Sequence, residues 1–204
     1  MQRALHLLAM LAVLPGPAAN AQVVKKKNLL ISAGGGASYG NISSSLPAYG
    51  AENAWGGNIT FGFGYAFNAN WGMGIRYDRL GYTSAFDTLD QARVSLLYLH
   101  GTYRPWQTDV HAVEIETGIG AATLSMRGLH ERIPAEARAV AWNMSVRYLH
   151  TLHRSIVAFC ALRGSGMGPA HLLRDDQDDP QNSPEPPTVR WTACWFNAGL
   201  AVRW

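Results

Sequence analysis

The chain ends in the stretch Trp191-Thr-Ala-Cys-Trp-Phe-Asn-Ala-Gly-Leu-Ala-Val-Arg-Trp204, which decides how the remaining sequence is interpreted. Counted backwards from the end, alternate residues are apolar: Trp204, Val202, Leu200, Ala198 and Phe196. The residues between them are small or polar: Arg203, Ala201, Gly199 and Asn197. A side-chain period of about two residues is typical of a β-strand with one apolar face. The stretch therefore predicts a strand whose last residue is an exposed indole.

The N-terminal segment has the organisation of a secretory signal peptide. Arg3 precedes an apolar run from Ala4 to Leu14, and a proline pair and an Ala-Asn-Ala triplet follow. We expect residues 1–21 to be removed before Gln22 and residues 22–204 to form one mature domain. No later stretch approaches the ~18 uninterrupted apolar residues of a membrane helix. The sequence thus predicts export without a membrane-spanning helix.

The composition is unusual for a water-soluble domain. The 204 residues include 21 Gly, 7 Trp and 8 Tyr, and only 15% are charged. Soluble domains usually contain roughly 25% charged residues. The formal net charge of +3 is small and scattered along the sequence, which argues against nucleic acid as a partner.

Seven further segments share the alternating pattern, and no helical pattern lies between them. The clearest covers residues 55–67, where aromatic residues alternate mostly with small ones, many of them glycines. The other expected strands are residues 29–39, 71–78, 93–103, 113–120, 140–148 and 155–167. Two of them, 93–103 and 155–167, have a weak pattern. In the first we place Leu97, Leu99 and Tyr103 outside and His100 inside.

The expected connections alternate in length. The short ones are residues 68–70, 105–109 and 151–154. The longer ones are residues 40–53, 84–91, 126–137 and 169–188. Short periplasmic turns, longer extracellular loops and an even strand number are typical of transmembrane β-barrels.

The character of the two strand faces separates a membrane barrel from a secreted lipocalin-like barrel, which shows the same alternation. One face consists of glycine and small polar residues with few charges, too little to coat a soluble surface. The other is large, aromatic and continuous from strand to strand. A narrow interior needs small residues and a few long paired polar ones, and a closed sheet satisfies every backbone group in lipid. The faces therefore favour a barrel with its apolar side facing lipid.

Aromatic residues near the strand ends predict two girdles at the level of the lipid headgroups. Those near the short turns are Phe67, Trp71, Tyr103, Trp106, Tyr148 and Trp204. Those toward the longer loops are Tyr39, Trp55, Tyr82 and Trp191.

These features together carry a resemblance to a known family. The terminal strand resembles the C-terminal insertion signal of outer-membrane β-barrels, here carried by Phe196, Leu200, Val202 and Trp204. The mature chain resembles a porin-family outer-membrane β-barrel of the small OmpA/OmpX membrane-domain type. The resemblance implies an all-β, eight-stranded antiparallel up-and-down transmembrane barrel in the outer membrane of a Gram-negative bacterium.

The same resemblance sets the expected partners and role. We expect contact with outer-membrane lipid and lipopolysaccharide, and with the barrel-assembly machinery during insertion. The expected role is structural, or an interaction at the cell surface through the extracellular loops, without a cofactor, a metal or an open pore. The sequence does not name the surface ligand.

Two carboxylates on one face of an expected strand are the main candidates for lumen chemistry. Glu114 and Glu116 would lie about 7 Å apart along the strand. Paired carboxylates can perform acid–base catalysis. In a lumen they more often neutralise arginines such as Arg76, Arg147 or Arg163, because an unpaired buried charge is costly. We therefore expect a lumen polar cluster of Arg76, Glu114, Glu116 and Arg147, with Glu116 facing Arg147 across a hairpin.

An enzymatic alternative rests on histidines. The segment Val146-Arg147-Tyr148-Leu149-His150 faintly resembles the stretch around the catalytic His of outer-membrane lipid A deacylases, which are also eight-stranded barrels. That family has Ser two residues after the His, where this chain has Leu152. His153-Arg154-Ser155 has the spacing, but no acidic residue follows until Asp175. We assign no catalytic residue and keep a lipid A-modifying enzyme and a soluble lipid-binding barrel as alternatives.

Two further patterns leave alternatives open. The acidic run at residues 174–179 could bind Ca²⁺, but it lacks ordered ligand spacing and is interpreted as a solvated loop. Cys160 and Cys194 are the only cysteines, and an exported protein meets an oxidising compartment. They would be directly opposed if the connecting loop were centred at residue 177. They form either a disulfide or two small apolar residues that face lipid.

We predict that Trp204→Ser reduces assembly into the membrane, because the terminal aromatic belongs to the insertion signal. The measurement is membrane fractionation combined with the mobility shift between unboiled and boiled samples on a gel. Loss of a girdle indole such as Trp106 should have a much smaller effect. Normal outer-membrane levels of Trp204→Ser would contradict the signal.

Overall fold

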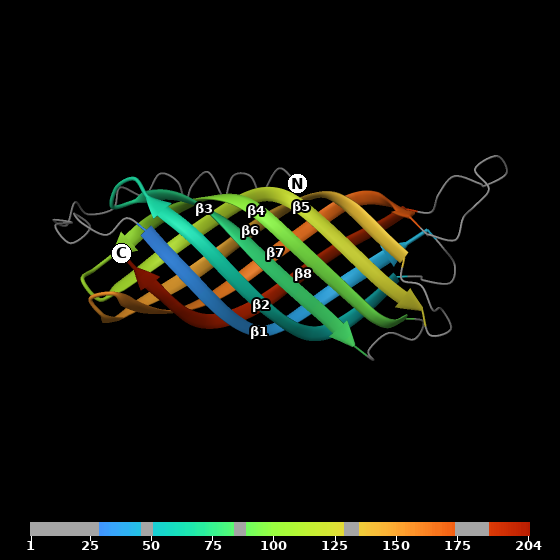
Figure 1. The fold of residues 1–204 in the computed structure, drawn as a ribbon, viewed down its shortest axis with the longest axis horizontal. Helices are drawn as coiled ribbons and strands as arrows, with labels where there is room; N and C mark the ends of the chain where they lie inside the picture. The colour runs from blue at the N-terminus through green and yellow to red at the C-terminus, as the bar shows by residue number, and fades with distance from the viewer. Residues whose placement is uncertain (1–28, 46–50, 84–88, 129–134, 174–187) are drawn as a thin grey trace, which may run out of the picture.

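The computed structural model describes residues 29–45, 51–83, 89–128, 135–173 and 188–204. These residues form eight antiparallel strands that close into a barrel in sequence order (Figure 1). The closure pairs β1 with β8, as it pairs every other neighbouring strand. No helix among the described residues is long and apolar enough to cross a membrane. The expected signal peptide, residues 1–21, lies outside the described residues.

The strands are longer than the sequence predicts. They are β1 Leu29–Ser44, β2 Ala51–Ala66, β3 Trp71–Thr83, β4 Leu89–Gln107, β5 His111–Gly128, β6 Ala135–His153, β7 Ile156–Leu173 and β8 Thr188–Arg203. A spanning strand needs only about 9–11 residues. Pairing continues into segments expected to be loops: Asn41 is paired with Asn53, and the Asn41 Nδ2 donates a hydrogen bond of 2.8 Å to the Asn53 Oδ1. The β1–β2 connection is thus shorter than expected.

The two ends of the barrel differ. The turns between β2 and β3, β4 and β5, and β6 and β7 lie at one end, together with Trp204. We call this the turn end and the opposite end the loop end. The alternation of short and longer connections is as predicted, because the strand pairs at the loop end are separated by more residues than those at the turn end.

The outer face carries the large apolar side chains, as the alternation predicts. Phe61 and Ile75 are 53% and 52% exposed, and the exposed set covers every strand. The phase expected for residues 93–103 is confirmed, since Leu97 and Leu99 point outward and His100 is buried inside. Such a surface is unsuited to water and suited to the hydrocarbon of a bilayer.

The lumen is narrow enough to require glycine where strands approach closely. A Cβ added to Gly120 on β5 would lie 1.8 Å from the carbonyl oxygen of Leu97 on β4. A Cβ on Gly36 would lie 2.1 Å from the carbonyl oxygen of Phe196. Any other residue at these positions would force the strands apart. The glycine-rich inner face therefore sets the small bore of the barrel.

The interior of the loop-end half is apolar, which differs from the small polar filling expected from the sequence. Its largest members are fully buried side chains: Ile42, Leu80, Tyr82, Leu96, Tyr98, Leu124, Met126, Trp191 and Trp195. We call this set the apolar plug. Two girdle assignments are therefore wrong, because Tyr82 and Trp191 point into the lumen. Strand parity places Trp191 on the face of Asn197, opposite Phe196.

The disulfide interpretation is also wrong, because both cysteines are free. The observed register pairs Cys160 with Ala198 and Cys194 with Gly164. The cysteines are four strand positions apart, about 13 Å, whereas a disulfide requires a Cα separation below about 7 Å. Both side chains lie on the outer face, as the apolar alternative expected. The expected register assumed a connecting loop centred at residue 177 and an uninterrupted pairing of the two strands. In the structure the pairing of β7 with β8 is irregular between Met167 and Ala170.

We predict that Phe61→Arg lowers the free energy of unfolding by about 2–4 kcal/mol, because Phe61 lies near the middle of the apolar band. The matched variant Phe67→Arg, at the turn end of the same face, should cost about 1 kcal/mol or less, because arginine there reaches the headgroups. Denaturant unfolding in lipid vesicles measures both. Equal costs would contradict the placement of the membrane along β2.

Candidate functional site

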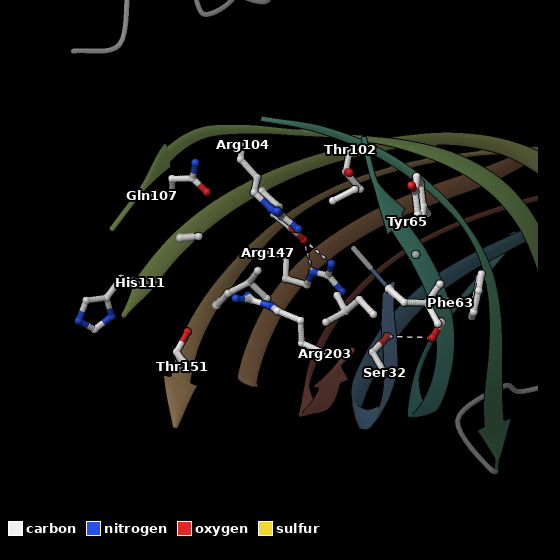
Figure 2. A pocket seen from close by; sticks show the side chains of 18 of the residues that line it. Ser32, Phe63, Tyr65, Thr102, Arg104, Gln107, His111, Arg147, Thr151 and Arg203 are labelled. Atoms are coloured by element: carbon white, nitrogen blue, oxygen red, sulfur yellow. Dashed lines mark hydrogen bonds and ion pairs between the residues drawn. The ribbon is translucent and has the colours of Figure 1, made fainter. Parts of the chain in front are cut away.

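Two fully buried glutamates form the centre of the polar lumen. Glu114 and Glu116 both lie on β5 and alternate with outward residues, so that both side chains point inward. Isolated buried carboxylates would be costly. Arginines from four other strands surround them, and Figure 2 shows Arg104 and Arg147 reaching toward the same part of the lumen.

Glu116 is held by a bidentate ion pair. The Arg76 Nη1 and Nη2 donate to the two carboxylate oxygens of Glu116, at 2.5 and 2.7 Å. The Ser145 hydroxyl donates to Oε2 at 2.6 Å, and the Arg163 Nη1 lies 3.6 Å from the same oxygen. Paired parallel N–H donors give such a contact strength and a fixed geometry. Glu116 is therefore a fully engaged structural carboxylate.

Glu114 joins the cluster toward the turn end. The Arg104 Nε donates to its Oε1 at 2.5 Å. The Arg147 Nε donates to its Oε2 at 2.8 Å, and the Arg147 Nη2 also donates to Oε2. The same Nη2 lies 3.3 Å from the Oε1 of Glu116, so Arg147 links the two carboxylates.

The structure brings the four sequence-predicted members of the lumen cluster together but changes one pairing. The residue opposite Arg147 is Glu114, and the residue opposite Glu116 is Ser145. The expected direct pairing of Glu116 with Arg147 is therefore wrong by two positions. The long arginine side chain still reaches Glu116 as a diagonal neighbour.

Sequence reasoning missed Arg104 as a member of this cluster. Residues 105–109 were expected to form a turn, which placed Arg104 at a strand end. In the structure β4 continues to Gln107, and Arg104 shares the inward face with His100 and Thr102. Every second residue of a strand lies on the same face. Counting from His100 to Thr102 and then to Arg104 would therefore have placed Arg104 inside.

Several buried polar groups lie between the ion pairs and the apolar plug. Both carboxylate oxygens of Asp78 and both side-chain polar atoms of Asn143 have no hydrogen-bond partner among the described residues. Tyr98 and Ser165 close this layer with a hydroxyl–hydroxyl hydrogen bond of 2.6 Å, and the Ser165 hydroxyl lies 2.5 Å from the Trp142 carbonyl oxygen. The lumen therefore passes from ion pairs to isolated polar groups and then to apolar side chains.

A cavity of about 730 Å³ fills the lumen at the turn end. Its inner wall is formed by Arg76, His100 and Glu114, and its mouth by residues in and beside the turns, including Gln107, Thr108 and Arg154. Arg104, Arg147 and Arg203 also line it, from three different strands (Figure 2).

The histidines considered for catalysis lie at the turn end. The His150 Nδ1 is 3.2 Å from the His111 Nδ1, and the His111 Nδ1 is 2.6 Å from the Tyr148 hydroxyl. His150 therefore faces a second imidazole ring, and that ring in turn contacts a phenol, where a deacylase-like site would need a serine and a carboxylate. Within the described ranges no group of three or more His, Cys, Asp or Glu could hold a metal. The acidic run 174–179 lies outside the described residues.

We predict that Glu114→Gln and Arg147→Gln each destabilise the barrel by about 3–5 kcal/mol, because each leaves a buried charge without its partner. The double variant should cost less than the sum, with a coupling free energy of about 0.5–3 kcal/mol. Denaturant unfolding of the four proteins measures the cycle. The exposed pair Glu136–Arg138, at 3.6 Å, serves as control and should couple by less than about 1 kcal/mol. Additive effects at Glu114 and Arg147 would show that they are not energetic partners.

Comparisons with known proteins agree with this architecture. No protein-family model matches the sequence, and no curated protein matches it. Neisserial surface protein A (NspA) is 14% identical, with a TM-score of 0.56 over 86% of this chain and 97% of that chain. The outer-membrane protein OprG of Pseudomonas aeruginosa is 12% identical, with a TM-score of 0.56 over 87% of this chain and 96% of that chain. A major outer-membrane protein of Thermus thermophilus is 13% identical, with a TM-score of 0.54 over 88% of this chain and 100% of that chain. The chain thus has the fold of the small OmpA/OmpX-type outer-membrane β-barrels, and its apolar outer face is suited to a lipid bilayer.

Proposed function

We propose that the protein is a closed outer-membrane barrel with a structural or surface-interaction role, and that it does not conduct solutes. The observation that carries this proposal is the apolar plug, in which Leu80, Leu96, Leu124 and Trp191 are completely buried. Side chains with no access to water leave no room for a hydrated ion. A solute that entered from either end would meet this barrier.

The ion-pair cluster forms a second barrier below the plug. Arg76, Arg147 and Arg163 reach the same carboxylate from three strands. An opening of the lumen at this level would have to break contacts between buried charges, which is strongly unfavourable. The two barriers differ in chemistry, so a single substitution in one of them does not open the other.

We assign the surface-interaction role to the segments at the loop end. The segment at residues 174–187 is the longest stretch between two strands, and its sequence is rich in Asp and Pro. A closed lumen leaves the outside of the barrel and its connections as the surfaces that can meet a partner.

We further infer two partners of the outer surface. The exposed apolar side chains would contact membrane lipid, including lipopolysaccharide in the outer leaflet. The terminal strand, with Phe196, Leu200, Val202 and Trp204 all exposed on one face, would present the insertion signal to the barrel-assembly machinery.

We predict that the purified protein in planar lipid bilayers shows no discrete conductance steps, because the plug excludes water. A sixteen-stranded porin, whose wider bore encloses an aqueous channel, provides the positive control in the same bilayers. Stable, reproducible open steps from the wild-type protein would overturn the proposal of a closed lumen.

The surface role is tested separately. Replacing residues 176–185 by a short Gly-Ser linker should leave the heat-dependent gel shift of the barrel unchanged, because folded strands supply its stability. Adhesion of expressing cells to a surface should decline in the same strain. If adhesion does not change after each of the longer connections has been replaced in turn, the surface-interaction role is wrong.

A further inference from the structure

The cavity at the turn end is not explained by a closed structural barrel. The plug seals the lumen on one side, whereas residues in and beside the turns, such as Thr108, Leu152 and Arg154, line the other side of the cavity. Its volume of about 730 Å³ lies within the range of about 300–1,000 Å³ that is usual for small-molecule sites. A purely structural lumen could have been filled by side chains at this end as well.

The charges around the cavity do not balance. Arginines outnumber carboxylates in and directly behind it. The arginines are Arg76, Arg104, Arg147, Arg154, Arg163 and Arg203, and the carboxylates are Glu114, Glu116, Asp78 and Asp109, with Arg154 and Asp109 at the mouth. The difference is an excess of two positive charges. Buried charge requires compensation, and the described residues provide no further carboxylate within the lumen cluster.

Arg203 is a partly buried arginine of the cavity wall that has no partner among the described residues. It lies on β8, points into the cavity (Figure 2) and is partly buried. Its guanidinium makes no hydrogen bond or ion pair with another described residue, although the charges of Arg104 and Glu114 act on it. Glu114 is already shared by Arg104 and Arg147. A guanidinium free to donate, beside a second arginine, is a site for an anion.

The remaining walls indicate the rest of the ligand. Apolar side chains line the cavity beside the arginines: Leu29, Leu30, Ala66, Ala112, Leu149 and Leu152. If an inorganic anion were bound, these apolar side chains would stay exposed to water. An apolar group of the ligand would cover them, which is favourable because apolar surface is removed from water. All strands are paired around the barrel, so a ligand enters from the aqueous space at the turn end and not sideways from lipid.

We propose that this cavity binds a water-soluble organic anion, a carboxylate or phosphate monoester with an apolar body. The anionic group lies between Arg203 and Arg104, and the body lies against Leu30 and Leu149. This site is independent of the closed lumen proposed above, since it lies on the other side of the ion-pair cluster from the plug.

Titration calorimetry with phenyl phosphate tests the site, using the full-length mature barrel in nanodiscs of zwitterionic lipid. We expect saturable binding to one site, weaker binding of inorganic phosphate, and no binding of benzyl alcohol or benzylamine. Arg203→Gln should weaken binding of phenyl phosphate by about ten- to a hundredfold, the usual effect of removing a hydrogen bond to a charged group. Arg203→Lys should restore most of it.

Arg138→Gln is the matched control, because the Arg138 side chain is 74% exposed and lies outside the cavity; its binding should equal that of the wild type. If Arg203→Gln does not assemble, the wild-type protein still decides the question. Phenyl phosphate, but not benzylamine, should then raise the unfolding temperature, because a ligand of the native state stabilises it.

Three results would overturn the proposal. The first is equal binding of phenyl phosphate and benzyl alcohol, and the second is wild-type affinity in Arg203→Gln. The third is competition by an anionic phospholipid added to the discs, which would assign the site to a lipid headgroup instead of a soluble anion. Conductance measurements do not depend on any of these outcomes, so failure of this site and failure of the closed lumen are distinguishable.

Discussion

Closure of the sheet between β1 and β8 is the constraint on which the rest of the structure depends. Lipid offers no hydrogen-bond partner, so every backbone N–H and C=O in the membrane needs one within the protein. The seam is continuous, from Leu30 opposite Arg203 to Ser44 opposite Val189. At the turn end the amide of Trp204 donates to the carbonyl oxygen of Leu29 at 3.0 Å. The last residue of the chain thus takes part in closing the barrel.

A small closed barrel has little room, and this determines what its inner face can contain. Glycine is required where a Cβ would meet the neighbouring strand, as at Gly120 and Gly36. The remaining space is filled in two different ways. Near the loop end large apolar side chains exclude water, and near the middle long charged side chains extend across the bore and pair. The exclusion of water strengthens these ion pairs, because charges interact more strongly at low dielectric.

The sequence predicted the strand number, the order of long and short connections and the outer face, because a two-residue period depends only on local side-chain direction. It also predicted which face carries Glu114 and Glu116. It did not predict the apolar plug, and it assigned Tyr82 and Trp191 to a girdle, because both faces carry large apolar residues in the loop-end half. Trp195 and Phe196 are both aromatic, yet Trp195 is buried and Phe196 is exposed.

Register across strands was the second limit of the sequence. Parity fixes the face of a residue, but the residue directly opposite depends on the exact turn and on bulges. The separations of Cys160 from Cys194 and of Glu116 from Arg147 both follow from registers different from those expected. Both cysteines nevertheless lie on the outer face, as the lipid-facing alternative expected. Errors of an even number of positions preserve a face and change only the neighbours.

The loop-end half of the lumen is filled by apolar side chains and the turn-end half holds a cavity, so the two ends of the barrel differ in chemistry. The apolar plug shields the ion pairs from the loop end, so any water or counter-ion must approach them from the turn end. Glu116 is saturated by its contacts, and Glu114 is shared between two arginines. The positive charge that remains is therefore concentrated at the inner wall of the cavity and at Arg203. A structure that needs only to be closed has no use for this asymmetry, which is why the cavity, and not the plug, is the region where we expect binding.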